Sequence, residues 1–263
     1  MGCALVRLIA ADGGHRLAGA LTEAGDPRLG RDAGTVAGVD PLGIALSADL
    51  AVALGRGPAG AEVVIDFTAP GAAAGHAAAC AAGGQALVMG TTGLDAGALA
   101  ALDAAAARIP VLYARNMSLG VTVLTELVHQ AAALLGPDFD AEIVEAHHRD
   151  KKDAPSGTAL QLGEALAAAR GRPLAEVAVY GRHGLGPSGR PPGAIGFAAL
   201  RAGAIVGDHT VLLAGAEEQL ELTHRATDRT LFARGALRAA GWLAGKPPGR
   251  YSLRQVLGLP DWT

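Results

Sequence analysis

A segment near the middle of the chain gathers most of the side chains that could carry out proton chemistry. Residues 145–158 read Glu-Ala-His-His-Arg-Asp-Lys-Lys-Asp-Ala-Pro-Ser-Gly-Thr, with two histidines, one arginine and two lysines inside six positions. Imidazole and ammonium groups can donate protons, and cationic groups stabilise negative charge that develops during a reaction. We therefore expect a general-acid pair and an anionic substrate at this segment.

The end of the same segment predicts a site for a carboxylate. Ser156, Gly157 and Thr158 stand where the next helix is expected to begin. The first turn of a helix offers backbone N–H groups without helical partners, and the helix dipole favours negative charge there. A glycine also lets a ligand approach the backbone closely. The sequence therefore predicts a carboxylate-binding turn beside the general acid.

Two other interpretations of this segment are open. Adjacent histidines in an extended chain point to opposite faces, and neither a cysteine nor a His-x-x-x-His spacing accompanies His147 and His148, so we expect no metal ion. Composition alone is also compatible with a solvated polar loop. The isolated histidines have no comparable polar neighbourhood in the sequence, so we expect surface or hydrogen-bonded core residues at His76, His129, His183 and His209.

The composition excludes several classes of protein. The 263 residues carry 22 Lys and Arg against 25 Asp and Glu, so no basic field attracts nucleic acid, and the 50% hydrophobic content is too high for a disordered chain. The most apolar stretch, 72–89, is interrupted by glycines and polar residues, so no membrane span is expected. The start lacks the pattern of a secretory signal. Only Cys3 and Cys80 occur, which excludes a disulfide framework and favours the cytoplasm.

The two halves of the chain predict different scaffolds for the charged segment. The first half alternates short β-like runs with alanine-rich helical runs, a pattern typical of βαβ units with a parallel sheet. Its expected strands are 17–21, 62–67, 85–89 and 111–114, and its expected helices are an initial one that stops at Gly13-Gly14, then 71–82 and 95–108. We expect a Rossmann-like α/β domain from this half.

The second half predicts an α+β domain with a mixed sheet, because several strands follow one another without crossover helices. The expected order is helix 121–135, strand 140–146, polar loop 147–156, helix 158–169, then strands 177–180, 195–201, 209–214 and 219–224. A final helix, 230–244, is expected to return to the first domain. The predicted domains are 1–118 with 228–263, for dinucleotide binding, and 119–227, for substrate binding and oligomerisation.

The beginning of the chain departs from the expected nucleotide-binding pattern. A dinucleotide-binding unit starts with a strand, continues through a glycine-rich turn, and then enters a helix. The sequence begins at what reads as that helix. We therefore expect either that the true start lies further upstream, or that another segment fills the place of the first strand and its glycine-rich turn.

An ordered set of motifs resembles one known family. Residues 142–160 resemble the signature of the 4-hydroxy-tetrahydrodipicolinate reductases, the dihydrodipicolinate reductases of bacterial lysine and diaminopimelate biosynthesis. Shorter matches occur at 65–68, 89–93, 114–118, 195–197, 201–203 and 206–210. Together these matches span nearly the whole chain.

The resemblance implies roles for individual residues. His147 takes the place of the family's proton donor and acceptor, and Lys151 that of a proton donor. The implied substrate-binding residues are His148, Gly157 and Thr158, and the implied cofactor-binding residues are Met1, Gly90, Thr91, Thr92, Ala114, Arg115, Asn116 and Met117. The resemblance also implies NADH or NADPH as cofactor, a small dicarboxylate as substrate, and a homotetramer formed through the second domain's sheet.

The implied reaction is the NAD(P)H-dependent reduction of 4-hydroxy-2,3,4,5-tetrahydrodipicolinate to 2,3,4,5-tetrahydrodipicolinate. Thr22 stands where the family usually has an acidic residue, and Ala69 where many relatives have a basic one, so the choice between NADH and NADPH is open. An alternative is an N-terminally truncated relative with impaired cofactor binding that acts as a binding or structural remnant. A further alternative is another NAD-linked dehydrogenase of similar two-domain plan.

Overall fold

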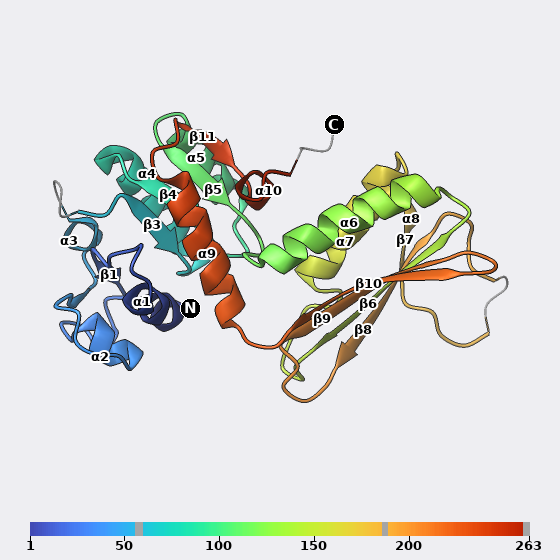
Figure 1. The fold of residues 1–263 in the computed structure, drawn as a ribbon, viewed down its shortest axis with the longest axis horizontal. Coiled ribbons are helices and arrows are strands. Elements are labelled where there is room, and N and C mark those ends of the chain that lie inside the picture. Colours follow the sequence, from blue (N-terminus) through green and yellow to red (C-terminus); the bar gives the residue numbers. More distant parts are fainter. Residues whose placement is uncertain (56–59, 186–188, 260–263) are drawn as a thin grey trace. The chain divides into compact units, whose positions relative to one another are not determined.

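The computed structural model of the protein describes residues 1–55, 60–185 and 189–259 (Figure 1). Contacts within the chain divide it into two compact units. The first consists of residues 1–118 together with the segment from 230 onwards, and the second consists of 119–229. The second boundary therefore falls two residues after the one expected from the sequence. Each sheet lies within one unit.

The first unit contains a four-stranded parallel sheet in the order β11-β5-β4-β3. Its strands are β3 (Val63–Asp66), β4 (Ala86–Met89), β5 (Pro110–Tyr113) and β11 (Gly249–Tyr251). The accompanying helical elements are η2 (Pro70–Ala72), α4 (Ala73–Gly83), α5 (Ala96–Ala106), α9 (Thr230–Leu243) and α10 (Leu253–Val256). All four residues of β4 are buried, as an uninterrupted apolar run predicts for a central parallel strand. The segments that follow β3, β4 and β5 therefore leave the sheet at the same edge.

The N-terminal part of this unit is built from short elements. They are α1 (Gly2–Ala11), β1 (Ala20–Leu21), α2 (Ala33–Ala37), β2 (Leu46–Ser47) and α3 (Leu50–Leu54). β1 and β2 pair with each other in a separate two-stranded parallel sheet, and among the described residues no strand joins this pair to β3. The strand expected over 17–21 is thus correct only for its last two residues, because pairing with β2 extends no further.

The second unit contains a five-stranded mixed sheet in the order β10-β9-β6-β8-β7. Its strands are β6 (Asp140–His147), β7 (Ala178–Tyr180), β8 (Ile195–Arg201), β9 (Gly207–Ala214) and β10 (Gln219–Ala226), and its helices are α6 (Leu119–Leu135), α7 (Gly157–Ala169) and α8 (Leu174–Val177). β6 runs parallel to β8 and antiparallel to β9. The expected fold class, a Rossmann-like parallel-sheet unit followed by an α+β unit with a mixed sheet, is confirmed.

The central strand β6 alternates strictly between buried and more exposed positions. Successive side chains of a strand point to opposite faces, so Ile143, Glu145 and His147 share one face. That face is covered by α7, which contacts β6, β8 and β9. Two polar side chains are therefore carried into the interior by the same alternation that buries Ile143.

Of the helices within the described residues, none is both long enough and apolar enough to cross a membrane.

Candidate active site

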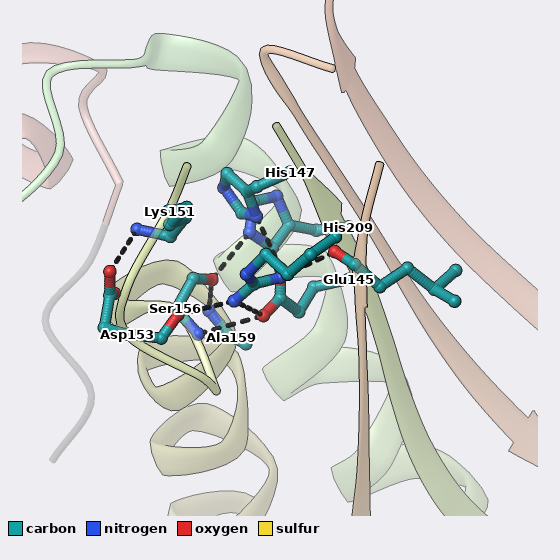
Figure 2. A network of polar contacts seen from close by, with 9 residues as sticks. Glu145, His147, Lys151, Asp153, Ser156, Ala159 and His209 are labelled. Atoms are coloured by element: carbon teal, nitrogen blue, oxygen red, sulfur yellow. Dashed lines mark hydrogen bonds and ion pairs between the residues drawn. The ribbon is translucent and has the colours of Figure 1, made fainter. Parts of the chain in front are cut away.

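The candidate site lies where β6 ends and α7 begins. His147 is the last residue of β6, and Ser156 caps α7, its Oγ accepting a hydrogen bond of 3.2 Å from the backbone N–H of Ala159. Figure 2 shows Ser156, His147 and His209 gathered around the carboxylate of Glu145, whereas Lys151 turns toward Asp153. A strand end and a helix start thus hold one polar network.

Glu145 is the centre of this network and is only 1% exposed. Its carboxylate accepts bonds from Arg201 Nη1 (2.9 Å) and Nη2 (2.7 Å), from His147 Nδ1 (2.5 Å) and from the backbone N–H of Ser156 (3.2 Å). Burial by itself raises the pKa of Glu145, but the bonds from Arg201 and His147 outweigh it and hold the pKa below its usual value. The buried carboxylate is therefore ionised.

The charge on Glu145 determines which nitrogen of His147 carries a proton. An ionised carboxylate can only accept hydrogen bonds, so Nδ1 of His147 must be the protonated nitrogen. Burial lowers the pKa of His147, and the bond to Glu145 opposes this only in part, so the ring is neutral at neutral pH. Nε2 is then an acceptor. It lies against Gly207, where a Cβ atom would stand 3.0 Å from Nε2.

His209, from β9, completes the buried network. Its ring packs edge-on against His147 with 5.1 Å between centroids, and its Nε2 lies 3.0 Å from Ser156 Oγ. Burial, with a smaller effect from His147, lowers the pKa of His209 to about 4, so this ring is also neutral at neutral pH. His209 is a core histidine, as expected, but the expectation that it lacks a polar neighbourhood is wrong. Its neighbours come from β6 and from the start of α7, which the local sequence does not reveal.

Lys151 lies in the loop between β6 and α7. Its Nζ donates a 2.8 Å hydrogen bond to Asp153, whose side chain is 58% exposed. His148 is half-buried directly after β6, and Gly157 and Thr158 are the first two residues of α7. A Cβ atom on Gly157 would meet nothing within 4 Å, so the space beside this helix start is open. The predicted catalytic and substrate-binding residues thus lie between the last residue of β6 and the second residue of α7.

The cofactor-binding residues expected in the first unit follow neighbouring strands. Gly90, Thr91 and Thr92 come after β4, and the segment 114–117 comes after β5. Ligands of open parallel sheets bind at the carboxyl ends of the strands, so the sheet order fits a dinucleotide at these loops. Met1 lies elsewhere in sequence, as the N-cap of α1.

A second buried carboxylate supports the loop after β4. Asp66, only 3% exposed, accepts hydrogen bonds from Thr91 Oγ1 (3.1 Å), Thr68 Oγ1 (2.7 Å) and His76 Nδ1 (2.7 Å). Burial raises the pKa of Asp66, but the bonds from His76 and Thr68 lower it by more. His76 is therefore another histidine whose polar neighbourhood the sequence did not indicate.

Among the described residues of the second unit, one group of side chains resembles a metal site. One ligand atom each from Glu145, His147 and His209 falls within 4.8 Å of the others. However, both oxygens of Glu145 accept bonds from the guanidinium of Arg201, and a divalent cation would have to sit beside that positive charge. We therefore assign these three residues to a hydrogen-bond network and not to metal ligation.

The fold and this site define a two-domain NAD(P)H-dependent oxidoreductase. A family model described as dihydrodipicolinate reductase, N-terminus, matches residues 1–117, and one described as dihydrodipicolinate reductase, C-terminus, matches residues 120–257. The chain belongs to the dihydrodipicolinate reductase family. Because the matches extend over both the N-terminal and the C-terminal parts of the family, they argue against the alternative of an N-terminally truncated relative with impaired cofactor binding that acts as a binding or structural remnant.

Individual relatives agree with this assignment. The chain is 54% identical to a 4-hydroxy-tetrahydrodipicolinate reductase of Anaeromyxobacter dehalogenans, over 98% of this chain and 94% of that protein. It is 51% identical to a reductase of the same name from Alkalilimnicola ehrlichii, over 98% and 95% of the two chains. Among solved structures, a dipicolinate-bound dihydrodipicolinate reductase from a Paenisporosarcina species shares the fold, with a TM-score of 0.71, 20% identity, and coverage of 95% of this chain and 92% of that one.

Proposed function

We propose that the protein catalyses the NAD(P)H-dependent reduction of 4-hydroxy-2,3,4,5-tetrahydrodipicolinate to 2,3,4,5-tetrahydrodipicolinate, a step of lysine and diaminopimelate biosynthesis. The observation that carries this proposal is the 54% identity, over 98% of the chain, to a reductase named for that substrate. The unbroken segment 145–158 supports it, because it holds every residue that the reaction is expected to need for substrate binding and proton transfer.

The substrate's carboxylates are assigned to His148, Gly157 and Thr158. Support comes from the position of Gly157 and Thr158 at the start of the 13-residue helix α7, where backbone N–H groups and the helix dipole favour an anion. The open space beside Gly157 leaves room for a carboxylate to approach the backbone.

Proton transfer is assigned to Lys151 and His147. Bound NADH or NADPH supplies the hydride, and we assign its binding to Met1, to residues 90–92 and to residues 114–117. Loss of the substrate's 4-hydroxyl as water gives a conjugated cyclic imine, and addition of hydride to this imine leaves negative charge on the substrate, which a nearby acid must neutralise by protonation. The Lys151 ammonium can leave its exposed partner Asp153 at low cost, because exposed ion pairs are worth about 1 kcal/mol or less. Nε2 of His147 can accept or return a proton.

The two units then take different roles: the first unit binds the dinucleotide, and the second unit, residues 119–229, binds the substrate and joins subunits. The proposed assembly is a homotetramer formed through the sheet of the second unit. Its support is an exposed apolar strip on the sheet face opposite α7, where Leu200 is 56% and Val144 is 38% exposed. Light scattering of the purified protein would give the number of subunits.

The proposed location is the cytoplasm. Its support is that Cys3 and Cys80 are both free thiols, as is usual in a reducing compartment. Fractionation of cells that express the tagged protein would test this location.

The activity is tested with the purified chain, the substrate, and either NADH or NADPH. We expect substrate-dependent oxidation of the reduced nicotinamide with at least one cofactor, and formation of the reduced dicarboxylate. Absence of turnover with both cofactors, under conditions where the protein is folded, would overturn the proposal. A His147→Ala variant, which lacks one of the proposed proton-transfer groups, serves as the control.

A further inference from the structure

The Glu145 carboxylate is only 1% exposed and is hydrogen-bonded to His147, a proposed proton-transfer residue. Burying an ionised carboxylate costs several kcal/mol unless its oxygens are hydrogen-bonded and its charge is balanced. Glu145 meets both conditions through donors from three places in the fold: His147 on β6, Arg201 on β8, and the backbone N–H of Ser156 at the start of α7. Because both oxygens of Glu145 are hydrogen-bonded and its charge is balanced, the carboxylate is held in one position.

Arg201 sets the orientation of this carboxylate. Its two terminal nitrogens contact different oxygens of Glu145, at 2.9 and 2.7 Å, and a planar guanidinium in this arrangement fixes the plane of its partner. Arg201 is itself held, because the same nitrogens donate to the backbone carbonyls of Leu200 (2.7 Å) and Asp153 (2.5 Å). Glu145 therefore has little freedom to turn away from His147.

We propose that Glu145, held by Arg201, is a positioning residue that keeps a proton on Nδ1 of His147 and leaves Nε2 as the atom that exchanges a proton during the reaction. This inference rests on the proposed role of His147. It adds a third group to the loop chemistry, one that touches neither the substrate nor the cofactor. Its effect is to select one tautomer and one ring orientation.

The charged and titratable groups around His147 allow the direction of the effect to be worked out. Besides Glu145 on the same strand, His147 faces Arg201 from β8, His209 from β9 and Lys151 from the following loop. Glu145 raises the pKa of His147, whereas Lys151 and Arg201 lower it, and His209 is neutral at neutral pH. Loss of the Glu145 charge therefore lowers the pKa of His147, and loss of the Arg201 charge raises it.

The main experiment compares the pH profiles of kcat and kcat/KM for Glu145→Gln and Arg201→Gln with that of the parent enzyme. In Glu145→Gln we expect kcat to fall at least about tenfold, which is a part of what a positioned acid–base group contributes. We also expect the limb of the pH profile that reflects titration of His147 to move to lower pH. In Arg201→Gln the same limb is expected to move to higher pH. A purely structural role for Glu145 predicts loss of activity without these opposite shifts.

Glu142→Gln provides a matched control. Glu142 is a carboxylate on the same strand, on the opposite face, and it also pairs with two arginines, Arg182 (2.6 Å) and Arg190 (3.0 Å). The substitution removes the same charge from β6 without touching the His147 network. We expect the pH limbs of this variant to coincide with those of the parent. A shift as large as that of Glu145→Gln would show that any charge on β6 produces the effect, which contradicts the proposal.

The His147→Ala variant separates the two levels of the argument. If it retains near-normal kcat, the proposed role of His147 fails, and the inference fails with it. If it is inactive while Glu145→Gln and Arg201→Gln keep the parent's pH limbs, the role of His147 stands and the positioning role of Glu145 is refuted.

A measurement on the unchanged protein covers the case in which Glu145→Gln does not fold. The nitrogen chemical shifts of a histidine ring distinguish a proton on Nδ1 from one on Nε2. We expect His147 to carry its proton on Nδ1 at neutral pH, whereas a ring protonated on Nε2 would overturn the proposal.

Discussion

Each unit of the protein buries a carboxylate near the carboxyl end of a strand and bonds it to a histidine, but the two networks balance the charge in different ways. Glu145, on β6, pairs with the guanidinium of Arg201 and with His147. Asp66, the last residue of β3, accepts instead from the hydroxyl groups of Thr68 and Thr91 and from His76. A guanidinium keeps its carboxylate ionised at all ordinary pH values, whereas hydroxyl donors tie loops together without adding charge.

The difference indicates a division of work between the two networks. A carboxylate held by an arginine can fix the tautomer of a histidine for proton transfer. A carboxylate held by threonines fixes the loop in which those threonines lie, and Thr91 belongs to the proposed cofactor loop. We therefore expect variants near Glu145 to change turnover, and variants near Asp66 to change cofactor affinity.

The largest expected effect comes from Lys151→Ala. Loss of the proposed proton donor should lower kcat at least about a hundredfold, the lower end of what general acid catalysis contributes. The affinity for the reduced nicotinamide, measured by calorimetry, should stay the same, because the substitution lies in the other unit. Lys246→Ala, which removes a lysine that packs on the Trp242 ring, is the control and should keep the parent's kcat. Near-normal turnover in Lys151→Ala would remove Lys151 from the mechanism.

The next effect is on stability and follows from His209. Its pKa is about 4 in the folded protein against about 6.5 when unfolded, so the unfolded chain takes up the proton first as the pH falls. The stabilisation is complete above pH 6.5 and is lost as the pH falls through about 4, a change of about 3 kcal/mol in the free energy of unfolding. Urea unfolding at several pH values would measure it. His209→Gln should show a smaller decrease over this range, and an unchanged decrease would contradict the prediction.

The smallest effect is expected from Asp66→Asn, which weakens the bonds that hold Thr91. A hydrogen bond to a charged group is worth about 1.5–3 kcal/mol, so partial loss of this network should raise the Kd for the reduced nicotinamide about tenfold. The kcat at saturating cofactor should change much less. Asp103→Asn, an exposed carboxylate on α5 that pairs with Arg250, is the control. If Asp66→Asn lowers kcat as strongly as Lys151→Ala, the proposed division of work is wrong.

The sequence predicted those parts of the site that are contiguous in the chain. The run from Glu145 to Thr158 contains a strand end, a polar loop and a helix start, and each is fixed by local patterns: alternation in β6, and a serine cap for α7. The apolar run of β4 likewise predicted a buried parallel strand.

The partners of Glu145 and His147 from other strands could not be predicted. Arg201 is 56 residues from Glu145, and His209 stands opposite Glu145 only because of the register between β6 and β9. Register depends on the packing of the whole sheet, which no local pattern contains. The short elements α2, β2 and α3 were missed for a related reason, since two to five residues carry too little periodicity to identify them.

The first residue of β9, Gly207, lies beside the ring of His147. Gly207 has no side chain, so its backbone lies beside the unprotonated nitrogen of His147 with no Cβ atom between them. A Cβ atom at this position would stand 3.0 Å from that nitrogen, which is closer than ordinary van der Waals contact. The space beside the proposed proton-exchanging atom thus depends on a residue that has no side chain.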